Sequence, residues 1–217
     1  RVSRGYMGVL LTDVTPALQQ ALSLSVSRGA MVQDFTSDSP AERSGIRVYD
    51  IVTDINGQDI GTNEELIRDI SARQPGDVVR VEVSRDGRNV TVPVRLVERP
   101  RGSEPSRDFA GDDRHGLYPA TPLGLTVREL DRGFAGRLEV PSSVRGVVVQ
   151  RVDPTGVAFS AQMRRNFVIT EINRRPIRSV ADYDRVVRSA RPGDVLAFYY
   201  YDPSSGQRAL LTVTVEP

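Results

Sequence analysis

The residues best suited to chemistry stand near the start of the chain, around Gly8. This glycine lies between the apolar residues Met7 and Val9 and leads directly into a β-prone run that ends at Thr12. A glycine has no Cβ, so the backbone can turn sharply there and approach another group closely. Successive N–H groups of such a turn can form a nest that holds an anion. An extended peptide could add to the open edge of the following strand while its terminal carboxylate occupies the nest.

Other kinds of chemistry find little support in the residue types. The chain has one histidine, His115, and no cysteine, and no serine stands in a glycine-flanked nucleophile motif. A Ser-His-Asp triad is therefore not expected within this sequence, and we predict no catalytic residues here. Disulfides and thiolate metal sites are excluded, and we expect no metal and no cofactor. The adjacent Glu64 and Glu65 stand at a predicted helix start, where they favour the helix dipole.

Composition is that of an ordinary globular protein. Hydrophobic residues make up 39% of the 217 residues, charged residues 26%, and the net charge is +1. This balance gives no electrostatic reason to expect nucleic acid or an anionic membrane as a partner. No apolar run approaches the length that spans a bilayer. Since the chain begins at Arg1 without a methionine or a signal-like segment, we expect an upstream region.

The elements that must position the candidate nest occur twice. Asn56 returns as Asn173, Gly76 as Gly193 and Gly29 as Gly146, each after 117 residues and each within a similar motif. A constant offset across separated motifs indicates a duplicated folding unit, and about a hundred residues is the size of a small domain. We predict a first domain over residues 1–98, a polar, turn-rich linker over 99–121 and a second domain over 122–217.

Periodicity predicts the same order of elements in both domains, hence an α+β fold with small antiparallel sheets. A serine-proline start and a terminal glycine predict a short helix over 38–45, and an apolar stripe predicts a longer one over 62–72. Predicted strands of the first domain cover 29–35, 50–55, 78–83 and 89–97. In the second domain we predict strands over 146–152, 167–172, 195–201 and 209–215 and helices within 153–163 and over 179–190.

A set of motifs in this order resembles a PDZ domain of the bacterial HtrA (Do/DegP/DegQ) serine proteases. They are Tyr6-Met7-Gly8-Val9, Ser39-Pro40-Ala41, Ser44-Gly45, Asp50-Ile51-Val52, Ile55-Asn56-Gly57 and Pro75-Gly76-Asp77. The second domain matches more loosely, so the chain resembles a tandem PDZ region. The resemblance implies two small antiparallel β-sandwiches or barrels, each capped by two helices. One departure is Tyr49, which stands before Asp50 where the family usually has glycine.

The resemblance also implies the parts of a peptide site in the first domain. The carboxylate loop would be Tyr6, Met7, Gly8 and Val9, the pairing strand Leu10, Leu11 and Thr12, and the groove helix Leu66, Ile67 and Ile70. From the residues alone, the stripe of Leu66 and Ile70 favours core packing, whereas Ile67 favours the groove. An apolar helix face must be covered, either by the core of the domain or by a ligand.

The second domain departs from this pattern. Its loop position is held by Leu123, Gly124 and Leu125. On the helix, Tyr183, Asp184 and Val187 take the places of Leu66, Ile67 and Ile70. A carboxylate at Asp184 would repel a peptide's terminal carboxylate unless it points to solvent. We therefore expect the second domain to bind peptide weakly or not at all and mainly to make protein contacts.

By this resemblance, the chain is the regulatory, substrate-recognition region of an HtrA-type serine endopeptidase of the bacterial periplasm or envelope. It would capture the C-termini of unfolded or misfolded proteins by strand addition. Its partners would include its own protease domain and, in the full-length protein, further copies of itself, but no nucleic acid. Two alternatives remain open, a standalone envelope PDZ adaptor and an oligomerisation module without a peptide ligand.

Overall fold

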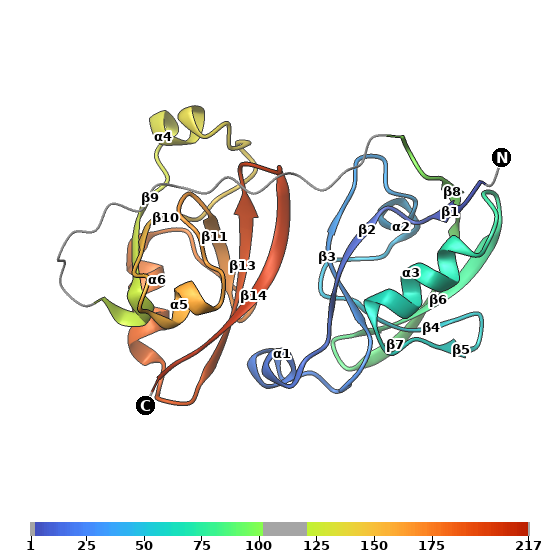
Figure 1. The fold of residues 1–217 in the computed structure, drawn as a ribbon, viewed down its shortest axis with the longest axis horizontal. Helices are drawn as coiled ribbons and strands as arrows, with labels where there is room; N and C mark the ends of the chain where they lie inside the picture. Colours follow the sequence, from blue (N-terminus) through green and yellow to red (C-terminus); the bar gives the residue numbers. More distant parts are fainter. Residues whose placement is uncertain (1–2, 102–120, 217) are drawn as a thin grey trace. The chain divides into compact units, whose positions relative to one another are not determined.

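The computed structural model describes residues 3–101 and 121–216. The chain divides into two compact units, which we call unit 1 (residues 1–104) and unit 2 (residues 105–217) (Figure 1). The predicted linker, residues 99–121, falls mostly on residues 102–120, which are outside the described residues, as is His115. The linker's bounds therefore stay a prediction.

Unit 1 is built on an antiparallel sheet in the order β2-β3-β4-β6-β7, with β5 beside β4 and a separate β1–β8 pair. Its strands are β1 Gly5–Tyr6, β2 Val9–Asp13, β3 Ala30–Phe35, β4 Ile51–Ile55, β5 Gln58–Asp59, β6 Val78–Arg85, β7 Arg88–Arg95 and β8 Val97–Glu98. Its helices are α1 Pro16–Leu22, α2 Pro40–Ser44 and α3 Asn63–Ser71. Strand β2 is the edge of the main sheet, so within the described residues one of its two sides has no neighbouring strand.

Unit 2 repeats this order with β9-β10-β11-β13-β14 and β12 beside β11. Its strands are β9 Leu125–Glu129, β10 Val147–Val152, β11 Val168–Ile172, β12 Arg175–Pro176, β13 Val195–Asp202 and β14 Gln207–Thr214. Its helices are the 3₁₀ turn η1 Pro122–Gly124, then α4 Arg132–Arg137, α5 Val157–Ser160 and α6 Val180–Ser189. The predicted antiparallel α+β architecture is confirmed, with β9 at the edge that corresponds to β2.

Each unit also has an α-helix that the sequence pattern did not predict, so the described residues of each contain three α-helices rather than two. The additional helices, α1 and α4, follow the edge strands β2 and β9. Both are short, and their N-caps are the side chains of Thr15 and Asp131, which accept from Leu18 N–H and Phe134 N–H. One or two turns carry too little apolar periodicity to stand out in the sequence.

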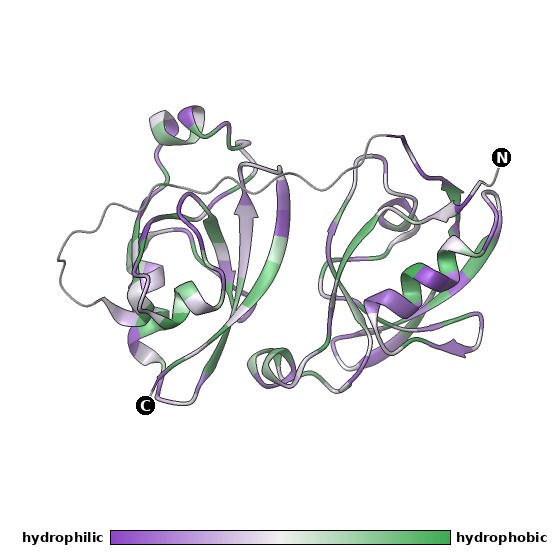
Figure 2. Ribbon diagram, in the orientation of Figure 1, coloured by the Kyte–Doolittle hydropathy of each residue, from purple (hydrophilic) through white to green (hydrophobic). Residues whose placement is uncertain are grey.

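The core of each unit forms where alternating strand residues meet a helix face. In β6, Val79, Val81 and Val83 are fully buried, as expected for a strand with one face on the core. Helix α3 packs against this core and against strands β1 to β4 (Figure 1). Figure 2 shows hydrophobic and hydrophilic residues mixed along α3, and its buried residues are Leu66 and Ile70.

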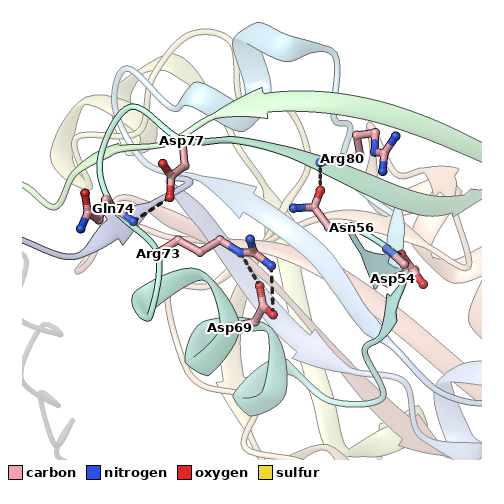
Figure 3. Close-up of polar contacts among 8 residues, drawn as sticks. Asp54, Asn56, Asp69, Arg73, Gln74, Asp77 and Arg80 are labelled. Atoms are coloured by element: carbon pink, nitrogen blue, oxygen red, sulfur yellow. Dashed lines mark hydrogen bonds and ion pairs between the residues drawn. The ribbon is translucent and has the colours of Figure 1, made fainter.

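The motifs that repeat at 117 residues make the same turns in both units. Asn56 Oδ1 accepts from Arg80 N–H at 2.7 Å (Figure 3), and Asn173 Oδ1 accepts from Ala197 N–H at 2.7 Å. Asp77 Oδ2 accepts from Gln74 N–H at 3.0 Å in unit 1. Asp194 does the same for Arg191 at 2.8 Å in unit 2. The repeated residues are therefore structural, and functional differences must be sought elsewhere.

The turn before β4 adopts a conformation that glycine would adopt more easily. Tyr49 has φ +74°, a left-handed value that is unfavourable for a bulky residue. Asn166 holds the corresponding place in unit 2 with φ +72°. The next residue in unit 1, Asp50, is buried and forms a bidentate ion pair with Arg85, with N···O distances of 2.8 and 2.7 Å. The turn is thus built without glycine.

Candidate functional site

The first component of the site is the unpaired edge of β2. Hydrogen bonds to the residues on either side of β3 flank the strand. Thr36 N–H donates to Gly8 C=O at 3.0 Å, and Val14 N–H donates to Gly29 C=O at 3.1 Å. Peptide groups of an antiparallel strand point alternately toward and away from the neighbour. With the observed register, those of Val9 and Leu11 point away from β3. The edge therefore presents backbone donors and acceptors in the spacing that an added strand requires.

The second component is the loop at Met7 and Gly8, whose carbonyl groups turn into the protein. Met7 C=O accepts from Ala41 N–H at 3.1 Å and from Ser39 Oγ at 3.2 Å, and Gly8 C=O accepts from Thr36 N–H. In a trans peptide unit the C=O and the following N–H point in opposite directions. The amides of Gly8 and Val9 are therefore turned outward. Within the described residues, Gly8 N–H has no protein acceptor.

Glycine is required at position 8 for two reasons. Its φ is +75°, and a Cβ there would lie 2.8 Å from Thr36 Oγ1 and 3.0 Å from Ser39 Cα. The hydroxyl of Tyr6 donates to the same Thr36 Oγ1 at 3.2 Å and anchors the start of the loop. The arrangement is a short, anchored turn with outward amides, a feature that it shares with anion nests.

The third component is helix α3, which packs beside β2. Leu66 and Ile70 are only 1% and 6% exposed and belong to the core, whereas Ile67 is 54% exposed. At the far end of β2, Asp13 Oδ1 accepts from Asn63 N–H at 2.7 Å and ties the strand to the start of α3. The apolar side chain that α3 leaves outside the core is therefore Ile67.

The pairing strand has one contact that the sequence did not reveal. Leu10, Leu11 and Thr12 are half-buried, and Leu11 packs on the core. The Leu11 carbonyl, one of the groups on the open edge, accepts from Gln33 Nε2 at 3.2 Å. Gln33 lies on the neighbouring strand β3 at an irregularity of the ladder. The sequence near Gln33 does not predict this contact, because the contact depends on the register between two strands.

The corresponding loop of unit 2 uses its amides differently. Gly124 is the equivalent of Gly8, because its carbonyl accepts from Asp153 N–H at 2.8 Å, 117 residues after Thr36. Its own N–H, however, donates to Thr121 C=O at 2.9 Å. The next amide, that of Leu125, donates to Pro122 C=O. Leu123 and Gly124 have φ of +63° and +71° and close a 3₁₀ turn. The donors that point outward in unit 1 are satisfied within the chain in unit 2.

Charge around this second loop is also unfavourable for an anion. A Cβ on Gly124 would lie 3.1 Å from the Cβ of Asp153. Hydrogen bonds from the Thr155 amide and hydroxyl hold the pKa of Asp153 below its ordinary value, so this side chain is anionic at neutral pH. A carboxylate brought to this loop would meet a like charge.

Helix α6 of unit 2 packs beside β9, but its side chains differ from those of α3. Tyr183, at the place of Leu66, is 4% exposed, and its hydroxyl has no hydrogen-bond partner among the described residues. Burial raises the pKa of Tyr183, with a smaller contribution from the nearby Asp184. Asp184 itself is half-buried, so it does not simply extend into solvent.

Comparison with known proteins identifies the family of unit 1. The PDZ domain family matches residues 5–96. Unit 1 is a PDZ domain. Most of the chain is similar to probable periplasmic serine endoproteases described as DegP-like. One from Halomonas elongata is 33% identical over 82% of this chain and 36% of its own length. One from Rhizobium meliloti is 28% identical over 95% of this chain and 40% of its own length.

Among solved structures, the HtrA-type protease AlgW with a decapeptide is 28% identical, with a TM-score of 0.43 over 46% of this chain and 30% of that one. The family match and the similarity to the DegP-like proteins confirm the resemblance to the PDZ region of HtrA-type proteases. The chain spans about two fifths or less of the length of these two curated relatives. The family match covers unit 1 alone. Because unit 2 repeats its strand order, units 1 and 2 are called the first and second PDZ domains below.

Other kinds of site find no support over residues 3–101 and 121–216. This part of the chain holds no group of three or more His, Cys, Asp and Glu side chains placed to bind a metal ion. None of its helices is long and apolar enough to cross a membrane. The β2 edge with its loop is therefore the candidate site.

Proposed function

We propose that the first PDZ domain captures the C-termini of unfolded or misfolded proteins by β-strand addition. The observation that carries the proposal is the pair of outward amides at Gly8 and Val9, beside the unpaired edge of β2. A terminal carboxylate would accept from these amides. The preceding peptide units would pair with Val9 and Leu11, and an apolar side chain of the ligand would lie against Ile67.

The expected affinity is modest. Three or four backbone hydrogen bonds contribute about 0.5–1.5 kcal/mol each, and one buried apolar side chain contributes about 1.5–3 kcal/mol. Part of this is offset by the loss of freedom on association. The balance is a weak affinity, and we expect a Kd of roughly tens of micromolar or above. Weak capture suits a module tethered to an enzyme, because tethering raises the effective concentration of the bound chain.

In the whole protein, these domains would serve as the substrate-recognition region of an HtrA-type serine endopeptidase in the bacterial periplasm or envelope. The proposal rests on similarity to relatives that are named as periplasmic endoproteases. The protease domain and the further copies of an oligomer would be partners of this region. The second PDZ domain, whose loop amides are already bonded, would make assembly contacts rather than bind peptide termini.

Titration with a pair of peptides tests the capture proposal. The peptides share one apolar sequence and differ only in a free or an amidated C-terminus. With the full 217-residue chain we expect a Kd of roughly tens of micromolar for the free acid, at least about tenfold weaker binding of the amide, and NMR shifts at Gly8 and Val9. Equal affinity for both peptides would contradict carboxylate capture. Absence of any shift would favour the oligomerisation module without a peptide ligand.

A further inference from the structure

Ser39 is a polar side chain held inside the first PDZ domain, between the loop and helix α2. It is 1% exposed. Its Oγ donates to Met7 C=O at 3.2 Å and accepts from Glu42 N–H at 3.2 Å. The same hydroxyl therefore caps α2 and holds the carbonyl that precedes the Gly8 amide.

This double contact controls the direction of a ligand-facing donor. While Met7 C=O points to Ser39, the planar peptide unit keeps Gly8 N–H pointing the other way. The second donor to Met7 C=O, the amide of Ala41, belongs to the first turn of α2. The position of that turn depends in part on its N-cap, again Ser39. Loss of the hydroxyl would loosen both bonds on the Met7 carbonyl.

The second PDZ domain supplies an internal comparison. The place of Ser39, 117 residues on, is held by Gly156, the N-cap of α5, which makes no side-chain cap bond. There the glycine amide of the loop, Gly124 N–H, turns to Thr121 C=O. In the first domain, where Ser39 supplies a hydroxyl, the Gly8 amide points outward. In the second domain, where Gly156 supplies none, the Gly124 amide is bonded within the chain.

We propose that Ser39 is a positioning residue for carboxylate recognition by the first PDZ domain. The inference rests on the proposed capture of C-termini and adds a residue that would not contact the ligand. Removal of the Ser39 hydroxyl should therefore weaken the recognition of the peptide's terminal carboxylate. Strand pairing along β2 and the apolar contact at Ile67 do not depend on the Met7 peptide unit, so they should persist.

The test compares Ser39→Ala with the wild-type chain, using the free-acid and amidated peptides. We expect Ser39→Ala to weaken binding of the free acid about tenfold, the loss of one hydrogen bond to a charged group. Binding of the amidated peptide should change less than about twofold. Thr15→Ala is the matched control, because it removes the N-cap hydroxyl of α1 in the same domain. It should leave both affinities unchanged.

Two further measurements separate positioning from general loosening. The Gly8 amide should shift on addition of the free acid in the wild type and much less in Ser39→Ala, while shifts along β2 remain. Ser39→Thr, which keeps a hydroxyl, should restore the preference for the free acid. The inference is overturned if Ser39→Ala, folded by NMR, prefers the free acid as strongly as the wild type, or loses affinity equally for both peptides. If the wild type itself shows no preference, the proposed function fails instead.

Discussion

The loops before β2 and β9 occupy the same place in two homologous domains but orient their amides differently. Both have a glycine with positive φ whose carbonyl accepts from a backbone N–H. The donor is Thr36, just after β3, in the first domain and Asp153, just after β10, in the second. In the first domain Gly8 N–H is turned outward, and in the second Gly124 N–H bonds to Thr121. A loop glycine is therefore not enough for an anion site. The partners of the neighbouring carbonyls decide where the donors point.

A second pair of positions shows how different interactions support the same scaffold. Asp50 pairs with Arg85 in the first domain, whereas Phe167, 117 residues after Asp50, stacks on Tyr200 with ring centroids 4.3 Å apart. A buried ion pair is favourable only when both partners are present. An aromatic pair contributes through burial and stacking. The two domains should therefore respond differently to loss of one partner.

The largest expected effect is that of Asp50→Ala. It leaves the Arg85 guanidinium, whose side chain is 20% exposed, without its bidentate partner. We expect the first domain to lose about 3 kcal/mol of unfolding free energy. Phe167→Leu in the second domain should cost about 1–2 kcal/mol. Urea unfolding followed by domain-resolved NMR signals measures both, and equal losses would show that the two positions are energetically alike.

Next in size is the effect of adding a methyl group to each loop glycine. Gly8→Ala should reduce free-acid peptide binding at least about 30-fold, since the Cβ would press on Thr36 and Ser39 and disturb the outward amides. Gly124→Ala should destabilise the second domain by about 1–2 kcal/mol but leave peptide affinity unchanged. Calorimetric titration of both variants checks this. A comparable loss of affinity in Gly124→Ala would place a peptide site in the second domain as well.

A smaller effect is expected from Tyr183→Phe. The Tyr183 hydroxyl is buried and has no partner among the described residues, so its removal should stabilise the second domain by about 1 kcal/mol. Tyr6→Phe is the matched change in the first domain and removes a hydroxyl that is bonded to Thr36 Oγ1. It should destabilise by about 0.5–1 kcal/mol. Opposite signs in urea unfolding are the expected result, and destabilisation by Tyr183→Phe would reveal a partner for that hydroxyl.

The smallest expected effect is the contribution of the Asp131 cap to the pH dependence of the second domain's stability. Asp131 caps α4, and the hydrogen bond from Phe134 N–H holds the pKa of Asp131 below its ordinary value. Because the pKa is lower in the folded state, the cap contributes its full stability above about pH 4, the ordinary pKa of an aspartate. This contribution is lost as the pH falls through the pKa of Asp131 in the folded protein. Thr15, which caps α1, does not titrate. The unfolding free energy of Asp131→Ser should change less between about pH 5 and pH 2 than that of the wild type. An unchanged pH profile of this free energy would exclude the cap as the cause.

Much of this architecture could be predicted because it is encoded locally. Pro-Gly-Asp turns, Asn at positive φ and alternating valines act over a few residues, so their recurrence indicated the duplication and the order of strands. The short helices α1 and α4 were missed because brief elements leave weak periodicity. The roles of the α3 residues also stayed open, and the structure puts Leu66 and Ile70 in the core and leaves Ile67 exposed.

The order of residues alone is enough to show that the chain contains two copies of one fold, and where each loop glycine stands. Which amides those loops present depends on the folded chain. The donors that hold the Met7 and Gly8 carbonyls come from Thr36, Ser39 and Ala41, about thirty residues along the chain. Orientation of a peptide plane depends on partners brought together by folding. Local sequence could place the loop but could not tell the outward amide of Gly8 from the satisfied one of Gly124.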